Sequence, residues 1–251
     1  MINAMQPLLA KLPPQTSILD LLLPQITKLL QDDFIYWVDG GAGVGTTSAA
    51  YAAILDRELH EENKAKSLVA CYDPLPENVA VLRERFGDAP RFLIRDVALS
   101  NAAGEAIFSV PSRITSAGAG PWAPGTSYSG SLKHAAADRE KITVKTVRLA
   151  DEGIPRFDFV KLDLQGGELD ALKGMGDKLK EAKLLYIETQ LLHNWDVLSF
   201  LSENGFFLLF DRLQFGFDSS TKYLPFEALN KCGITIDRMH LPQNSGMPLI
   251  C

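Results

Sequence analysis

The sequence has 251 residues, of which 46% are hydrophobic and 22% are charged, and its formal net charge is −6. These values are typical of a globular protein, and we expect residues 1–251 to form a single α/β domain. The net charge is negative and Lys and Arg form no dense run, which argues against a nucleic-acid partner because its phosphates would be repelled.

The sequence shows neither a secretory signal nor a membrane span. Its first residues, MINAMQPLLAKLPPQTS, lack the basic start, apolar core and cleavage site of a signal peptide. No segment approaches the roughly 18 apolar residues that cross a bilayer. The cysteines, Cys71, Cys232 and Cys251, lack metal-ligand spacing, and Cys71 fits a buried thiol in a reducing compartment. We therefore expect a cytoplasmic protein with no membrane partner and no metal site.

Hydrophobic patterns predict helices and strands that alternate along the chain. Residues 1–33 form an N-terminal extension with a helix over about 17–31. Next come a strand at 34–39, a helix at 46–59, a strand at 67–73, a helix at 76–86 and strands at 91–100 and 105–110. Then follow strands at 142–149 and 159–164, a helix from 168, a strand at 182–189 and a helix at 195–205. Two apolar segments, 206–212 and 213–218, precede a less regular tail. This alternation predicts a parallel sheet with helices on its faces.

Residues 111–140 interrupt the pattern. The segment SAGAGPWAPGTSYSGS within them is rich in glycine, serine and proline. An aperiodic stretch of this length is commonly a functional loop, or else disordered. We predict a substrate loop or lid here.

The most informative segment is VDGGAGVGTTS, from Val38 to Ser48. Asp39 ends the first strand, and Gly41, Gly43 and Gly45 alternate through the turn into a helix. Glycine lets the backbone adopt positive φ and lets a ligand approach closely, and the start of the helix presents free N–H groups. The segment therefore predicts a ligand-binding loop; a tight turn that serves packing alone is the alternative.

The spacing of these glycines argues against a dinucleotide. The fingerprint G-x-G-x-x-G requires its third glycine one position after Gly45, and Asp39 would repel a pyrophosphate. A ligand with a positive centre and no phosphate fits better, and S-adenosylmethionine is such a ligand. An NAD(P)-dependent oxidoreductase is the less favoured alternative.

Two acids follow the second and third strands. Asp73 lies beside the glycine loop, where it can accept hydrogen bonds from both ribose hydroxyls; capping the next helix is its alternative and compatible role. Asp96 can accept a hydrogen bond from an adenine amino group, although Arg95 offers a salt bridge instead. Both acids are candidate cofactor contacts.

Seven motifs in this order resemble those of FkbM-type methyltransferases: VDGGAGVG, YDPLPENVAVL, VALSNAAGEAIFSV, SGSL, KTVRLADEG, DFVKLDLQGGELDALKGM and LLYIET. The resemblance extends over roughly residues 34–190. It implies a Rossmann-like class I methyltransferase fold, with a mostly parallel seven-stranded sheet, helices on both faces and an antiparallel last strand. It also implies S-adenosylmethionine-dependent O-methylation. By the resemblance, cofactor contacts carry over to Asp39, Gly41, Gly43, Asp73 and Asp96.

The sequence departs from the family pattern at two strand ends. The family usually reads K-I-D-V-E-G-A-E where this chain has KLDLQGGE, so Gln165 replaces an acid; Gln190 stands where an I-E-x-H pattern places histidine. An amide does not take up a proton near neutral pH, so neither glutamine can be a general base. A hydrolase or metal-dependent reaction loses support for the same reason. The main alternative is a methyltransferase-like protein that binds the cofactor without catalysis.

Three residues are candidates for chemistry on the acceptor, which we expect to be a small metabolite or a glycan-like molecule. Asp163 and Glu188 end neighbouring strands on the side of the glycine loop. Asp163 can orient the acceptor hydroxyl, accept its proton or hold the cofactor ammonium, and pairing with Lys161 is its structural alternative. His193 can replace the missing histidine as a base, or else lie on the surface. Glu168 is expected to offset a helix dipole.

Overall fold

The computed structural model describes residues 35–111, 132, 139–190, 194–214 and 235–242. Its larger sheet contains β1 (Tyr36–Gly40), β2 (Leu68–Tyr72), β3 (Phe92–Arg95), β7 (Phe159–Leu162), β8 (Leu184–Gln190), β9 (Phe206–Gln214) and β10 (Thr235–Pro242). A smaller sheet contains β4 (Ala98–Leu99), β5 (Gly104–Pro111) and β6 (Arg139–Val147). The helices are α3 (Thr46–Glu58), α4 (Glu61–Lys64), α5 (Pro76–Phe86), α7 (Glu168–Gly174) and α8 (Asn194–Glu203), with short 3-10 helices η1 (Leu149–Asp151) and η2 (Gly176–Glu181).

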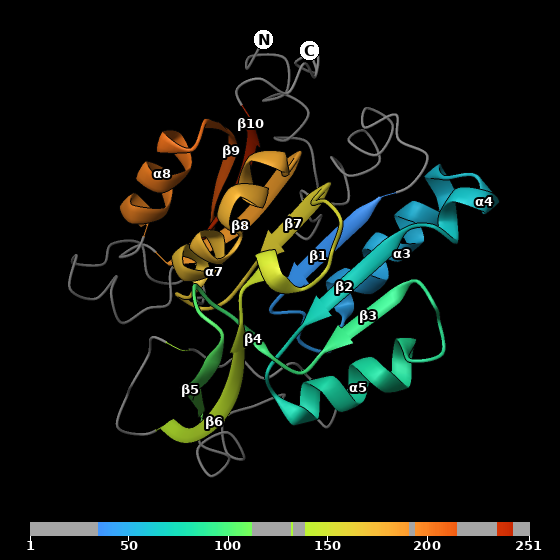
Figure 1. Ribbon diagram of the computed structural model, residues 1–251, viewed down its shortest axis with the longest axis horizontal. Coiled ribbons are helices and arrows are strands. Elements are labelled where there is room, and N and C mark those ends of the chain that lie inside the picture. The colour runs from blue at the N-terminus through green and yellow to red at the C-terminus, as the bar shows by residue number, and fades with distance from the viewer. Residues whose placement is uncertain (1–34, 112–131, 133–138, 191–193, 215–234, 243–251) are drawn as a thin grey trace, which may run out of the picture.

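The larger sheet has the strand order β3-β2-β1-β7-β8-β10-β9 (Figure 1). The pairs from β3 to β8 are parallel, and β10 runs antiparallel to both β8 and β9. This order confirms the expected Rossmann-like α/β fold, with a mostly parallel sheet of seven strands and an antiparallel last strand.

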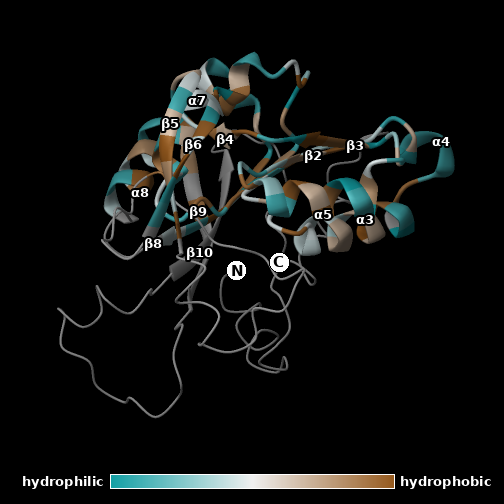
Figure 2. Cartoon of the chain, turned by 90° about the horizontal axis from the view of Figure 1, so that it is seen from below, coloured by the Kyte–Doolittle hydropathy of each residue, from teal (hydrophilic) through white to brown (hydrophobic). Residues whose placement is uncertain are grey.

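Successive side chains of the parallel strands point into two hydrophobic layers, as the pleat requires. On one face, Trp37 and Phe159 belong to a core with Tyr51 of α3. On the other face, Val38 and Val160 belong to a core that includes residues of α7 and α8. Figure 2 shows α3 and α5 on one side of the sheet and α7 on the other. Helices on both faces explain why the strands read as continuous apolar runs.

The strand register places several polar positions at one edge of the sheet. Asp39 pairs with Cys71 of β2 and with Lys161 of β7, and Gly40 is the last residue of β1 in both ladders. Asp73 and Asp163 follow directly after β2 and β7. The carboxyl ends of the three strands therefore converge.

The structure differs from the sequence prediction in several places. The segment expected as a strand at 91–100 contains β3 of the larger sheet and β4 of the smaller sheet. The strands expected at 105–110 and 142–149 are present, but they pair as β5 and β6 in the separate sheet β4-β6-β5. The tail described as irregular contains β10, whose mixture of charged and apolar residues hides the strand pattern. The predicted helix at 17–31 and most of the predicted loop at 111–140 lie outside the described residues.

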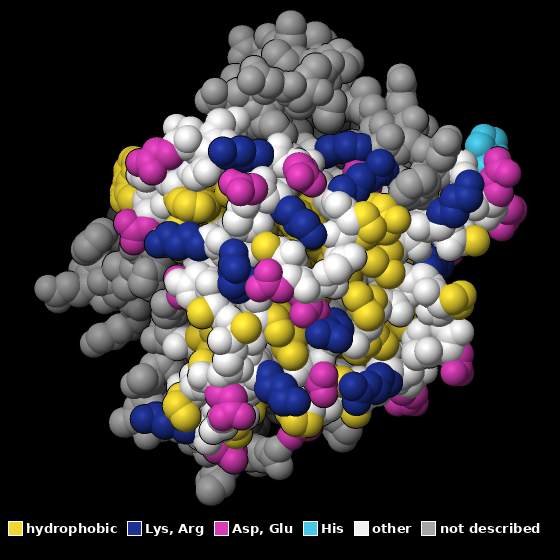
Figure 3. Space-filling model, viewed as in Figure 1, with side chains coloured by type: hydrophobic (Ala, Val, Ile, Leu, Met, Phe, Trp, Pro, Cys, Tyr) yellow, Lys and Arg dark blue, Asp and Glu magenta, His cyan; other side chains and the backbone are white. Residues whose placement is uncertain are grey.

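Basic and acidic side chains are mixed on one face of the described part of the molecule (Figure 3). No helix in the described ranges is long and apolar enough to cross a bilayer. Figure 3 shows Lys and Arg side chains interspersed with Asp and Glu side chains over the described part of that face.

Candidate functional site

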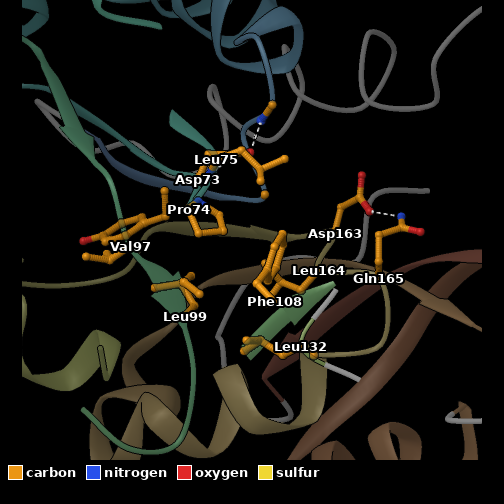
Figure 4. A pocket seen from close by; sticks show the side chains of 15 residues that line it. Asp73, Pro74, Leu75, Val97, Leu99, Phe108, Leu132, Asp163, Leu164 and Gln165 are labelled. Carbon is orange, nitrogen blue, oxygen red and sulfur yellow. Dashed lines mark hydrogen bonds between the residues drawn. The ribbon is translucent and has the colours of Figure 1, made fainter. Parts of the chain in front are cut away.

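A cleft opens where β1, β2 and β7 end. Its empty volume, including the part open to solvent, is about 610 Å³. Open α/β sheets bind ligands in this position, outside the carboxyl ends of their strands. Its lining residues come from the glycine loop, the ends of β2 and β7, the β3–β4 segment and β5 (Figure 4): Gly41, Gly43, Tyr72, Asp73, Pro74, Leu75, Val97, Ala98, Leu99, Phe108, Leu132, Asp163, Leu164, Gln165 and Gly167.

Gly41 holds the glycine loop against the neighbouring strand ends. Its φ is +73°, and a Cβ at this position would overlap the backbone carbonyl of Asp163. The N–H groups of Gly41 and Ala42 both donate to the carbonyl of Tyr72, at 2.9 and 3.0 Å. Glycine is therefore required here by both the backbone conformation and the close approach of β7.

Gly45 does not line the cleft. It is the N-cap of α3, with φ +80°, and a Cβ there would lie 2.5 Å from the ring of Phe86 and 2.8 Å from the side chain of Leu82. The packing alternative therefore explains Gly45, and the structure does not support the expected cofactor contact.

Asp39 lies beneath the loop and does not line the cleft. Its side chain is fully buried; its Oδ2 accepts a hydrogen bond from the Ser48 hydroxyl at 2.6 Å, and its Oδ1 lies 3.1 Å from Nζ of Lys161. These contacts give Asp39 a structural role, and the direct cofactor contact implied by the family resemblance stays a prediction. Asp39 shapes the loop that faces the cleft.

Lys161 ties the glycine loop to β7. Its ammonium donates to the carbonyl of Gly41 at 2.9 Å and of Gly40 at 3.4 Å, and lies 3.7 Å from Oδ2 of Asp163. Burial alone would lower the pKa of Lys161, but the carboxylates of Asp39 and Asp163 raise this pKa above its ordinary value. The lysine therefore remains charged, and the expected pairing with an acid is confirmed.

Asp73 connects the end of β2 to the glycine loop and lines the cleft. Its Oδ2 accepts a hydrogen bond from N–H of Gly43 at 2.9 Å, and its Oδ1 accepts from N–H of Leu75 at 2.9 Å and from Nδ2 of Asn78 at 3.1 Å. Burial raises the pKa of Asp73 to about 6, although these hydrogen bonds act in the opposite direction. Leu75 is the N-cap of α5, so Asp73 does not cap that helix.

Asp96 lies outside the cleft. Its side chain is 67% exposed, forms an ion pair with Arg83 at 3.7 Å, and faces a neighbouring groove between α5 and the smaller sheet. Arg95 pairs instead with Glu152 at 2.8 Å. The structure does not support the expected adenine contact, and the salt bridge that Asp96 forms is with Arg83 rather than Arg95.

The turn between β7 and α7 presents Asp163 and Gln165 to the cleft. Nε2 of Gln165 donates to Oδ1 of Asp163 at 2.8 Å, and Figure 4 shows the two side chains next to one another. The backbone N–H of Asp163 donates to the carbonyl of Gly40 at 3.1 Å, which fixes the start of the turn. Among the described residues, Gln165 is the only non-glycine residue with positive φ, at 53°.

Glu168, the first residue of α7, stabilises this turn from within. Its side chain is buried, and its Oε1 accepts hydrogen bonds from N–H of Leu164 at 2.8 Å and of Gly166 at 3.0 Å. Burial raises the pKa of Glu168 to about 7, against the effect of these hydrogen bonds. The sequence identified Glu168 as the start of a helix but did not reveal its bonds to the preceding turn.

Of the other predicted catalytic residues, only Glu188 lies in the described part of the chain. Glu188 lies in β8 opposite Asp237 of β10 and does not line the cleft, although its charge acts on Lys161. His193 lies outside the described residues. Within the described ranges, no group of three or more His, Cys, Asp or Glu side chains could hold a metal ion.

A protein-family model matches more than half of the chain. Residues 39–208 match the family model described as the methyltransferase FkbM domain. The chain belongs to the FkbM methyltransferase family. This confirms the resemblance drawn from the seven sequence motifs.

One curated relative has a named activity. Hexuronic acid methyltransferase AglP of Haloferax volcanii is 27% identical to this FkbM protein over 179 residues, which is 69% of this chain. The match spans 63% of the length of AglP.

Two of the similar solved structures are also methyltransferases. FkbM methyltransferase from Methylobacillus flagellatus KT superposes with a TM-score of 0.46 and 16% identity, over 82% of this chain and 44% of that chain. Precorrin-6y C5,15-methyltransferase from Geobacter metallireducens GS-15 gives a TM-score of 0.46 and 11% identity, over 87% of each chain.

The cleft of this FkbM protein has an apolar side, formed by Val97, Leu99, Phe108 and Leu132, that was not predicted from the sequence. Val97 and Leu99, directly after Asp96, line the cleft where Asp96 does not. Phe108 reaches the cleft from β5, with Leu132 nearby in the lining. The apolar segment after the third strand was visible in the sequence, but the contribution of β5 depends on the second sheet and was not.

Gly41→Ala should destabilise the protein by more than about 2 kcal/mol, because it adds both a strained φ and an overlap with Asp163. Gly153→Ala is the matched control: its φ is +72° and its Cβ would meet nothing within 4 Å, so it should cost about 1 kcal/mol. Urea unfolding measures both values. Equal losses for the two variants would show that the close approach to Asp163 does not matter.

Proposed function

We propose that this FkbM-family protein is an S-adenosylmethionine-dependent methyltransferase that acts on an oxygen of a glycan-like acceptor, such as a hexuronic acid. The observation that carries the proposal is that Gly41, Asp73 and Asp163 line one cleft at the carboxyl edge of the sheet. These residues come from three different strand ends, and the strand register brings them together.

The charge of the cleft suits the proposed cofactor. Asp73 and Asp163 are the charged residues among the described lining of the cleft, and that lining includes no Lys or Arg. The nearby ammonium of Lys161 is buried and already paired with Asp39 and Asp163. A dinucleotide pyrophosphate would therefore meet two carboxylates in the lining and no lining cation, whereas a ligand with an ammonium and a sulfonium is favoured. S-adenosylmethionine, when bound, supplies a methyl group on a positively charged sulfur.

Each part of the cleft has a role in this proposal. Asp73 would accept hydrogen bonds from the ribose hydroxyls, and Val97 and Leu99 would contact the adenine through an apolar surface. Asp163 would orient the acceptor hydroxyl, with 30% of its side chain accessible to solvent. Alignment of the acceptor oxygen is the main requirement, because the methyl carbon is already activated.

The glycan-like acceptor is supported by the relative AglP, which is named a hexuronic acid methyltransferase. A second candidate function is cofactor binding without catalysis. It is favoured by Gln165, an amide at a position where the family usually has an acid. An NAD(P)-dependent oxidoreductase has less support, because both the glycine spacing and the acidic lining disfavour a pyrophosphate.

Methyl transfer can be tested with methyl-labelled S-adenosylmethionine and oligosaccharides that contain glucuronic or galacturonic acid. We expect label in the acidic oligosaccharides, and less in matched neutral hexose oligosaccharides. Mass spectrometry should find one added methyl group on an oxygen of the acceptor. If the protein binds the cofactor but labels no acceptor, the alternative without catalysis is favoured.

A further inference from the structure

We infer that Gln165 is a positioning residue that holds the Asp163 carboxylate as a hydrogen-bond acceptor for the substrate hydroxyl. This inference rests on the proposed methyltransferase function. It gives the amide at position 165 a role in the site, where the family pattern alone suggests that an acid has been lost.

The backbone at Gln165 has a conformation that a residue with a side chain rarely adopts. Its φ is 53°, and Gly166 follows with φ +100°, so two successive residues of the turn have positive φ. Glycine adopts the left-handed region without steric cost, yet this chain has glutamine there, lining the cleft. Strain of this kind persists where the surrounding structure enforces it, and it is common at functional sites.

Glu168 enforces this conformation. Its Oε1 accepts hydrogen bonds from N–H of Leu164 and of Gly166, which lie on either side of Gln165. The carboxylate is buried, so water competes little for these bonds. The peptide group between Leu164 and Gln165 is held separately, because its carbonyl accepts a hydrogen bond from N–H of Gly167 at 3.3 Å. With the peptide groups on both sides of Gln165 held in this way, the direction of its side chain is restricted.

The Gln165 side chain completes a set of donors around Asp163. Its Nε2 donates to Oδ1 at 2.8 Å, and Nζ of Lys161 lies 3.7 Å from Oδ2. Each carboxylate oxygen therefore faces a donor or a cation. Because an oxygen of a carboxylate can accept more than one hydrogen bond, Asp163 can still accept from an acceptor hydroxyl in the cleft.

An acid at position 165 would change this arrangement. A carboxylate at position 165 would lie about as close to Asp163 as Nε2 of Gln165 does now, at 2.8 Å. Two carboxylates this close cannot both be ionised without a large cost in free energy, so they would share a proton over part of the pH range. The amide avoids this competition.

During transfer, the acceptor oxygen forms a bond to the methyl carbon as the carbon–sulfur bond breaks, and the electron pair stays on sulfur. The hydroxyl proton passes to Asp163 and then to water.

Three variants test the inference. Gln165→Gly removes the side chain and suits the backbone, and Gln165→Glu replaces the donor by an acid of the same size. Asn101→Asp is the matched control, because Nδ2 of Asn101 donates to Oδ1 of Asp170 at 3.2 Å on the exposed surface, outside the lining of the cleft. Each protein is assayed for methyl transfer to a glucuronic acid oligosaccharide from about pH 6 to 9, for S-adenosylhomocysteine affinity and for thermal unfolding.

We expect Gln165→Gly to unfold within about 3 °C of the natural protein, and to bind S-adenosylhomocysteine within about threefold of its affinity. Its kcat/KM should fall by about 10- to 100-fold, because the acceptor is no longer aligned. Gln165→Glu should add a pH dependence of the rate beyond the one that Asp73 gives to both proteins near pH 6, and Asn101→Asp should change neither rate nor pH profile.

The outcomes separate this inference from the proposed function. If the natural protein transfers methyl groups and both Gln165 variants retain its rate and pH profile, the inference is wrong and the function stands. If Gln165→Gly loses stability and activity together, Gln165 has only a structural role and the inference is again wrong. If the natural protein binds S-adenosylhomocysteine but methylates no acceptor, the proposed function fails and the inference fails with it.

Discussion

Lys161→Met should destabilise the protein by about 3–5 kcal/mol, because it leaves a buried carboxylate without its cation. The Asp39 side chain is fully buried, and its Oδ1 lies 3.1 Å from Nζ of Lys161. The same substitution removes the bonds from Nζ to the carbonyls of Gly40 and Gly41. We therefore expect the glycine loop to loosen and cofactor affinity to fall along with stability. Urea unfolding measures the first effect and calorimetric titration the second.

Two further variants identify the cause of this loss. In the double variant Asp39→Asn/Lys161→Met, the unpaired charge is gone, so we expect the double variant to be more stable than Lys161→Met alone. Lys64→Met is the control for an ion pair that reaches solvent: the side chain of Lys64 is 19% exposed and that of its partner Glu61 is 89% exposed, so loss of this pair should cost less than about 1 kcal/mol. A loss no greater for Lys161→Met than for Lys64→Met would contradict the structural role given to Lys161.

Asp73→Ala should weaken S-adenosylmethionine binding by about 100-fold or more and lower stability by about 2–4 kcal/mol. The carboxylate accepts hydrogen bonds from Gly43, Leu75 and Asn78, and all three donors would lose this partner in a buried site. Asp73→Asn should have an intermediate effect. The amide keeps one oxygen that can accept hydrogen bonds, but its NH2 group would face at least one of the three protein donors. Calorimetric titration and urea unfolding measure the two losses.

The affinity of the natural protein for the cofactor should also depend on pH through Asp73. Burial raises the pKa of this carboxyl to about 6, so it is ionised above this pH and protonated below it. A protonated carboxyl has less capacity to accept from two ribose hydroxyls, and affinity should therefore fall as the pH decreases through about 6. Asp96→Ala is the control, because Asp96 is exposed and outside the cleft. Equal effects of Asp73→Ala and Asp96→Ala would contradict the assignment of the ribose site.

Most strands of the larger sheet could be predicted from the sequence, because the run of apolar residues that marks a buried strand is a local feature. Apolar runs such as 67–73 form buried strands wherever helices cover both faces, and the glycine-rich turn after Asp39 marks the first crossover. The pairing of β5 with β6 was not predictable in the same way, since it joins segments separated by the aperiodic stretch at 111–140. For β10, mixed polarity concealed the strand.

The site was predicted less completely, because the roles of acids depend on contacts between distant segments. Asp39 and Asp73 both lie at the carboxyl ends of strands, yet one is buried under Lys161 and the other lines the cleft. Gly40 follows Asp39 and Pro74 follows Asp73, but this local difference does not show which acid faces the cleft. The partner of Asp96 is Arg83, on a helix across the neighbouring groove, rather than the adjacent Arg95. The turn in which Gln165 has positive φ is held by hydrogen bonds to Glu168, which the sequence does not reveal.

The most direct measurement of the central proposal is a calorimetric titration of the natural protein with S-adenosylmethionine, S-adenosylhomocysteine, NAD and NADP. A ligand that binds the native state also raises its apparent stability, so thermal unfolding with the same four ligands provides an independent check. We predict one site per chain for S-adenosylmethionine and for S-adenosylhomocysteine, lost in Asp73→Ala, with no binding of NAD or NADP. Binding of NAD or NADP without binding of S-adenosylmethionine would contradict the proposed function.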